Sequence, residues 1–232
     1  MPTQANNLTS PLRLLFIGNS ATYVNDIPGN LARLAQEAGY AIEHERLVKG
    51  GMLLSTYADP SNTYGQKALE LIQKGFDLVF IQDNGNCIST DEMQAASRAA
   101  CETLAAAIHA SGAKVGIYLR PPYGYENWDL APVSQALAFD KHFGAISDTV
   151  GALNVYVNRA FACAIKQTEF DLWGPDHAHT GPYGAYLAIC VFFATIFKTS
   201  STVLSADGLP EADARILQEI ADQVALNGAY PW

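Results

Sequence analysis

The chain has 232 residues, which suits one domain, and 49% of them are hydrophobic while 16% are charged. This composition supplies enough apolar side chains for a large core and excludes an intrinsically disordered chain. The formal net charge of −9 argues against binding to nucleic acid, which needs clustered Lys and Arg.

Taken in chain order, apolar runs alternate with segments of helical periodicity. The pattern predicts strand 12–17, helix 28–38, strand 42–48, helix 62–75, strand 77–82, helix 90–110, strand 114–119, helix 133–150 and strand 153–157, followed by helices 159–166, 182–197 and 211–226. Asp26 is the expected N-cap of the first helix. Strands that alternate with helices imply right-handed crossovers and a parallel sheet covered on both faces. We therefore predict an α/β fold, a flavodoxin-like three-layer α/β/α sandwich with a five-stranded parallel sheet. Residues 1–232 are expected to form a single domain, with its core at about 12–198 and a C-terminal helix at 210–227.

The sequence carries no membrane or export signal that we recognise. It has no apolar run of about 18 residues, so we predict no membrane span and no membrane partner. Segment 1–11 is polar and lacks a basic region followed by an apolar one, so we expect no signal peptide and a cytoplasmic location. No cysteine pair forms a CxxC motif, and all four cysteines are expected to be free thiols, as in a reducing compartment.

Small and polar residues follow the first three predicted strands. They are Gly18-Asn19-Ser20, Gly50-Gly51 and Asp83-Asn84-Gly85-Asn86. Because sites in such sheets form at the carboxyl ends of the strands, we expect these residues to meet at one edge. Gly18 is expected to allow a sharp turn, and Asn19 to tie that turn together by hydrogen bonds.

Ser20 has three possible roles from its position: a turn or capping residue, part of a phosphate cradle, or a nucleophile. A serine after a strand is usually a turn residue or a helix cap. A phosphate cradle is disfavoured because neither GxGxxG nor GxxxxGK[ST] is present, and the GxSxG elbow of α/β-hydrolases is absent too. Ser20 is a candidate nucleophile only if a base and its orienting group are also present.

A base and an orienting carboxylate are three residues apart in the segment GPDHAHTG. An Asp-x-x-His arrangement on a tight turn, Asp176 with His179, can supply both to a serine nucleophile. The alternative is that Asp176 caps the next helix and His179 is a surface turn residue. A metal site at Asp176, His177 and His179 is the other alternative, but no further ligand pair shows suitable spacing, so we predict no metal and no cofactor.

Acyl transfer also needs fixed hydrogen-bond donors that stabilise the negatively charged oxygen of the transition state. The bare backbone amide of Gly51 and the side-chain amide of Asn84 meet that need. The alternatives are a tight Gly-Gly turn and an Asn-Gly turn.

Together these residues resemble the four blocks of the SGNH (GDSL-type) hydrolase superfamily. More narrowly, the segments LFIGNSATYVNDIP, KGGMLL, DLVFIQD and DHAHTGPYGAYLAICVFFATIF resemble a bacterial domain-of-unknown-function branch with GNS and DxxH blocks, over about residues 12–198. The resemblance implies a flavodoxin-like fold and ester hydrolysis without a cofactor. It implies Ser20 as nucleophile, His179 as base and Asp176 as the residue that orients it. The implied oxyanion donors are the backbone amides of Ser20 and Gly51 and one amide side chain.

Two positions depart from the family pattern. The third block reads Gln82-Asp83-Asn84-Gly85-Asn86 in place of Gly-x-Asn-Asp, so Asn84 is the expected side-chain donor and Gln82 the alternative. The last block reads His179-Thr180-Gly181 where the branch usually has His-Pro-Ser, and His177 adds a second imidazole nearby, but the D-x-x-H spacing selects His179.

Aromatic residues suggest the class of substrate. The loop RPPYGYENWD contains Tyr123, Tyr125 and Trp128, and Trp173 lies just before the Asp-x-x-His segment. These rings, with His177 at the rim, are expected to bind substrate by stacking on a sugar; the alternative is that they pack onto the domain or a dimer contact. We predict a serine esterase acting on small acyl esters, acetyl first, of a glycan or another small molecule. The alternatives are a catalytically weak glycan-binding module and a short-chain lipase or thioesterase.

Overall fold

The structure, a computed structural model, describes residues 10–229 and 231–232. Most of the polar N-terminal segment, residues 1–9, for which no signal peptide is expected, lies outside the described residues. Within them, five strands form one sheet in the order β2-β1-β3-β4-β5, and every neighbouring pair is parallel. The strands are β1 (Leu12–Gly18), β2 (Ile42–Val48), β3 (Leu78–Ile81), β4 (Lys114–Tyr118) and β5 (Leu153–Val155). This order is that of flavodoxin-like folds, as predicted.

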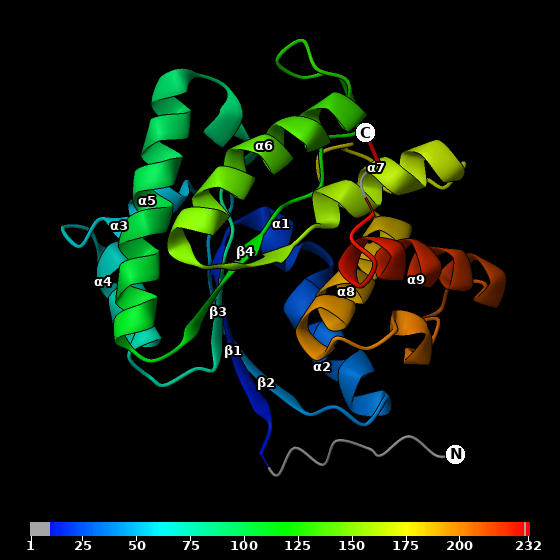
Figure 1. The fold of residues 1–232 in the computed structure, drawn as a ribbon, viewed down its shortest axis with the longest axis horizontal. Helices are drawn as coiled ribbons and strands as arrows, with labels where there is room; N and C mark the ends of the chain where they lie inside the picture. The colour runs from blue at the N-terminus through cyan, green and yellow to red at the C-terminus, as the bar shows by residue number, and fades with distance from the viewer. Residues whose placement is uncertain (1–9, 230) are drawn as a thin grey trace.

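Helices cover both faces of the sheet (Figure 1). One layer contains α2 (Ile27–Glu37), α7 (Val157–Gln167), α8 (Pro182–Phe197) and α9 (Glu211–Ala225), and the other contains α3 (Leu54–Ala58), α4 (Thr63–Ile72), α5 (Asp91–Ala110) and α6 (Pro132–Val150). Alternate strand residues face the two layers: Leu14 and Phe16 pack with the first, Leu15 and Ile17 with the second. Burial on both faces explains why the central strands are continuous apolar runs, and it confirms the predicted three-layer sandwich.

Element ends differ slightly from the prediction, and short elements were missed. Helix α8 has the predicted bounds, and the remaining predicted elements begin and end within three residues of those observed. The short helices α1 (Ser20–Tyr23) and α3 were not predicted, because four or five residues cannot display a 3.6-residue period. Asp26 occupies the N-cap position of α2 but makes no capping bond; its carboxylate pairs instead with Arg46.

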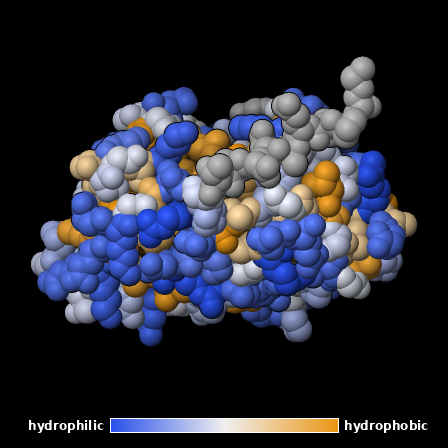
Figure 2. All heavy atoms as spheres, turned by 90° about the horizontal axis from the view of Figure 1, so that it is seen from below, coloured by the Kyte–Doolittle hydropathy of each residue, from blue (hydrophilic) through white to orange (hydrophobic). Residues whose placement is uncertain are grey.

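The state of the cysteines and the polarity of the surface are as the sequence predicts. Cys87, Cys101, Cys163 and Cys190 are all buried and unpaired, as expected. In the part of the chain that the structure describes, no helix is both long and apolar enough to span a bilayer. Figure 2 shows the molecule from below, where hydrophilic residues predominate and apolar residues are scattered.

Candidate active site

The predicted site residues lie where the order of the strands reverses. The chain passes from β1 outward to β2 and then back across to β3 on the other side of β1. Ser20 follows β1, and Asn84 follows β3, so both lie at the carboxyl end of this central pair. The crevice at such a reversal is the usual ligand site of an open α/β sheet.

The turn that presents Ser20 is held from below by Asn19. This residue is 3% exposed; its side chain accepts a hydrogen bond from the Ala21 amide at 3.1 Å and donates one to the Met52 carbonyl at 3.1 Å. Asn19 therefore ties the turn together, as predicted, and joins it to the loop after β2. Ser20 begins α1, and its backbone amide has no acceptor among the described residues, as expected for the first amide of a helix.

Gly18 acts differently from the prediction. It is the last residue of β1 and not a left-handed turn residue. A Cβ at Gly18 would lie 2.7 Å from Oε1 of Gln82 and 2.8 Å from Oγ1 of Thr22. The glycine is therefore needed for close packing beneath the nucleophile turn.

Gly51 and Asn84 meet at the same edge. Gly51 adopts φ +71°, a left-handed conformation that favours glycine. Nδ2 of Asn84 donates to the Gly51 carbonyl at 3.0 Å, and Oδ1 of Asn84 accepts from the Asn86 amide at 2.9 Å. These two bonds fix the orientation of the amide group and leave its second N–H free. The Gly51 amide has no acceptor among the described residues, so it too is available to a ligand.

Gln82, the alternative oxyanion donor, is committed to the turn. It is 2% exposed, and its Oε1 accepts hydrogen bonds from the Asn19 amide and the Thr22 hydroxyl, both at 2.9 Å. Its Nε2 donates to the Asp83 carbonyl. Gln82 is therefore part of the support below Ser20.

Asp83 holds two loops of the site together. Its Oδ1 accepts from the Leu54 amide at 2.8 Å and the Asn84 amide at 2.7 Å. Burial raises the pKa of this carboxyl group, and the interaction with the Ser97 side chain, followed by the bonds from the two amides, opposes that rise. Asp83 thereby joins the loop after β2 to the loop after β3.

Asp176 and His179 lie on one loop that ends at α8. Trp173 and Thr180 pair across this loop as an antiparallel bridge. Oδ2 of Asp176 lies 2.6 Å from Nδ1 of His179, while its Oδ1 accepts from the amides of Ala178 and His179, each at 3.0 Å. The hydrogen bond to the imidazole, followed by those from the amides, holds the pKa of Asp176 well below its usual range. Its carboxylate is therefore charged and fixes the imidazole in one orientation.

One cavity of about 350 Å³ brings the predicted residues together. Those that line it are Ser20, Gly51, Asn84, His179, Tyr123 and Tyr125, with Asn19, Ala21, Gly85, Arg120 and Ala178 between them. Ser20 and His179 both line this cavity, and their side chains form no hydrogen bond with each other.

Three predicted substrate-binding residues do not line this cavity. The Trp173 indole donates to the Pro122 carbonyl at 2.9 Å, and the Trp128 ring packs on Tyr123 with centroids 5.6 Å apart. Both indoles therefore pack against the aromatic loop and stabilise it. Their orientation is determined by these packing contacts. His177 is exposed with φ 50°, and its carbonyl accepts a 2.7 Å hydrogen bond from the Gly124 amide of that loop.

Two further residues of the site were missed. Arg120, 5% exposed, lines the cavity two residues beyond β4. Its position after a strand, like that of the other site residues, is the feature that could have revealed it. Asn25, with φ 58°, donates from Nδ2 to the carbonyl and hydroxyl oxygens of Thr180 at 2.5 and 3.1 Å. It anchors the loop that carries the histidine.

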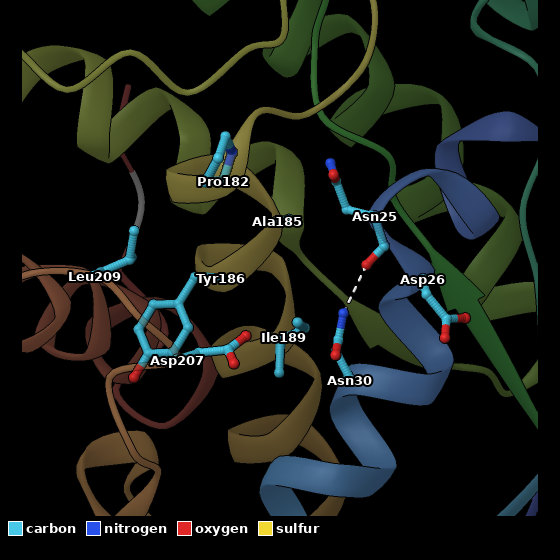
Figure 3. A pocket seen from close by; sticks show the side chains of 9 residues that line it. All are labelled: Asn25, Asp26, Asn30, Pro182, Ala185, Tyr186, Ile189, Asp207 and Leu209. Carbon is cyan, nitrogen blue, oxygen red and sulfur yellow. Dashed lines mark hydrogen bonds between the residues drawn. The ribbon is translucent and has the colours of Figure 1, made fainter.

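Asn25 also borders a second cavity of about 350 Å³ between α2 and α8 (Figure 3). Its lining contains Asp26 and Asp207 but no serine, cysteine or histidine, so it lacks the predicted pairing of a serine with a histidine.

In residues 10–229 and 231–232, no three His, Cys, Asp or Glu side chains gather closely enough to hold a metal ion.

Comparison with solved structures identifies the fold. A protein from Slackia heliotrinireducens described as a candidate SGNH hydrolase has 24% identity and a TM-score of 0.69, over 81% of this chain and all of that one. The chain has the fold of the SGNH hydrolases. A DUF4886 family protein from Bacteroides uniformis, with 16% identity, superposes with a TM-score of 0.80 over 94% of this chain and 96% of its own. The acetylxylan esterase Axe2 from Geobacillus stearothermophilus, with 17% identity, superposes with a TM-score of 0.60 over 76% of this chain and 90% of its own. No family model and no curated protein matches the chain.

Proposed function

We propose that this SGNH-fold protein is a serine esterase that hydrolyses small acyl esters by a Ser20-His179-Asp176 mechanism. One observation carries the proposal: a single cavity contains a serine at the tip of a central strand, an imidazole held by a carboxylate, and free amide donors. Each group alone has a structural explanation. Their convergence at the reversal of strand order supports a catalytic role.

In the first step, Oγ of Ser20 attacks the ester carbonyl carbon while Nε2 of His179 takes the hydroxyl proton. Asp176 holds Nδ1 of the ring and stabilises the imidazolium that forms. The negative charge that develops on the carbonyl oxygen is bound by the amides of Ser20 and Gly51 and by Nδ2 of Asn84. These donors are fixed before the reaction, so they stabilise the transition state without reorganisation.

In the second step, the intermediate collapses and His179 gives its proton to the departing alcohol. Water then attacks the acyl-enzyme while His179 takes its proton; the bond between the acyl carbon and Oγ of Ser20 breaks, His179 returns the proton to Oγ, and the carboxylic acid is released. No metal or cofactor takes part in this sequence.

The cavity supports a small acyl group on a carbohydrate alcohol. Its volume of about 350 Å³ is at the lower end of the range for ligand sites. Tyr123 and Tyr125 stack at 5.3 Å with an interplanar angle of 21°, and Tyr125 is 43% exposed, so it can offer a flat face to a sugar ring. The fold shared with an acetylxylan esterase supports acetyl as the first choice.

Hydrolysis of 4-nitrophenyl acetate by the wild-type protein and by Ser20→Ala tests the proposal. Loss of a triad residue costs several orders of magnitude, so turnover is expected in the wild type and only background in the variant. Acetylated xylo-oligosaccharides and a short-chain thioester would then identify the substrate class. A glycan-binding module would bind the sugars and release no acetate. Equal turnover by both proteins would overturn the proposal.

A further inference from the structure

Arg120 is a buried cation beside the proposed nucleophile. It follows β4 and lines the same cavity as Ser20 and His179. Only 5% of the residue is exposed. Its guanidinium lies over the Tyr123 ring, with Cζ 4.1 Å from the centroid, and 5.8 Å from the centroid of Phe139. These contacts fix the plane of the guanidinium against the cavity wall.

The charge of Arg120 has no acidic partner. Among the residues that the structure describes, no carboxylate pairs with it, and Nε is buried without an acceptor. Nη2 makes one long bond of 3.4 Å, to the Ala178 carbonyl. Arg159, which is equally buried, shows the usual arrangement: Asp140 accepts from its Nε at 2.7 Å and from its Nη2 at 3.1 Å. An unpaired buried charge costs stability, so its retention at a cavity points to a ligand.

The backbone leaves room for this guanidinium. Gly85, next to the proposed oxyanion donor Asn84, is buried against it. A Cβ at Gly85 would lie 2.2 Å from Nη1 of Arg120 and 2.5 Å from the Tyr123 hydroxyl. The absence of a side chain at Gly85 therefore leaves the space that the guanidinium of Arg120 occupies.

We propose that Arg120 binds a carboxylate carried by the ester substrate, an inference that rests on the proposed esterase function. Two parallel N–H groups of a guanidinium match the two oxygens of a carboxylate, and such charge-assisted bonds are the strong ones. One guanidinium, with no lysine or second arginine on the cavity lining, suits a single negative charge. The carboxylate belongs either to the acyl group, as in a half-ester of a dicarboxylic acid, or to the alcohol, as in an acid sugar.

Two matched pairs of esters distinguish these sources. Monoethyl succinate against ethyl succinamate tests the acyl side, and 4-acetoxybenzoate against 4-acetoxybenzamide tests the alcohol side. The wild type is expected to prefer the carboxylate of one pair by about 10–100-fold in kcat/KM, the range for a charge-assisted pair. Arg120→Gln should reduce that preference to about one. Arg215→Gln, which removes an exposed cation on α9, should retain it.

The outcomes separate this inference from the proposed function. Ser20-dependent hydrolysis of neutral esters with no carboxylate preference, unchanged in Arg120→Gln, would overturn the role of Arg120 alone. Failure to hydrolyse any ester would overturn the proposed function. Calorimetry with succinate and 4-hydroxybenzoate would then still test Arg120, since binding lost in Arg120→Gln supports the site and no binding overturns it. Should Arg120→Gln not fold, inhibition of the wild type by succinate but not by succinamide gives the same test.

Discussion

Asp176 contacts His179 twice: Oδ2 lies 2.6 Å from the ring nitrogen Nδ1, and Oδ1 accepts the backbone amide of His179 at 3.0 Å. The carboxylate thus fixes both the ring and the backbone that carries it. The ring nitrogen Nε2 has no partner among the described residues, so in the proposed mechanism it is the atom that accepts the proton of Ser20. The two contacts from Asp176 would keep this imidazole in one orientation.

The two histidines of this loop should differ sharply in function. His179→Ala should lower kcat/KM by at least about 10³-fold, because Ser20 then has no base. His177→Ala is the matched control, since its exposed side chain lies off the cavity, and it should lose less than about threefold. Kinetics of both variants on 4-nitrophenyl acetate check this, and a dead His177 variant beside an active His179 variant would contradict the assignment.

The pH profile should show that Asp176 stays charged. Its pKa is held well below the ordinary value of about 3.9, so the folded loop keeps this carboxylate ionised at any higher pH and loses its contribution only as pH falls through the depressed pKa. Asp176 should therefore add no acid limb to kcat/KM between pH 4 and 9. An acid limb in this range that disappears in Asp176→Asn would contradict this.

Removing the charge gives a second test of Asp176. Asp176→Asn should lower kcat by about 10–10³-fold, less than for a fully buried triad carboxylate, because its side chain is 53% exposed and water can partly replace it. Unchanged kcat in a folded Asp176→Asn variant would show that the carboxylate does not orient the base.

Substitution of Asn84 should affect catalysis, whereas substitution of Gln82 should affect stability. Asn84→Ala should lower kcat by about 10²–10³-fold with a smaller change in KM, as for other side-chain oxyanion donors. Gln82→Ala should lower the free energy of unfolding by about 1–3 kcal/mol, because it leaves the buried Asn19 amide and Thr22 hydroxyl without their shared acceptor. Urea unfolding and kinetics on both variants decide this, and a stable but inactive Gln82 variant beside an active Asn84 variant would reverse the roles.

Two glycines should respond to alanine with opposite signs. A methyl group at Gly18 would meet oxygens at 2.7 and 2.8 Å, so Gly18→Ala should destabilise the protein by about 1–3 kcal/mol and disturb the Ser20 turn. Gly144, within helix α6, has open space at its Cβ position, so Gly144→Ala should stabilise by about 0.5–1 kcal/mol. Equal unfolding midpoints for the two variants would contradict the close packing beneath Ser20.

Much of the fold could be predicted because burial on both faces makes the central strands unbroken apolar runs. The meeting of Ser20, Gly51 and Asn84 could be predicted because residues that follow parallel strands lie at one edge of the sheet. His179 was assigned to the same site through the Asp-x-x-His segment and the family resemblance. The side-chain directions of Trp128 and Trp173 could not be predicted, because loops have no periodicity to orient a ring. The burial of Arg120 could not be predicted either, since it depends on the bare backbone at Gly85 and the ring of Tyr123.

Covalent labelling of Ser20 tests the central claim most directly. A fluorophosphonate reacts with a serine that a neighbouring base activates, and peptide mass spectrometry locates the adduct. We expect one adduct, on the peptide that contains Ser20, with none in Ser20→Ala and little in His179→Ala. Labelling of another residue, or an unlabelled Ser20 in protein that still hydrolyses esters, would contradict the account.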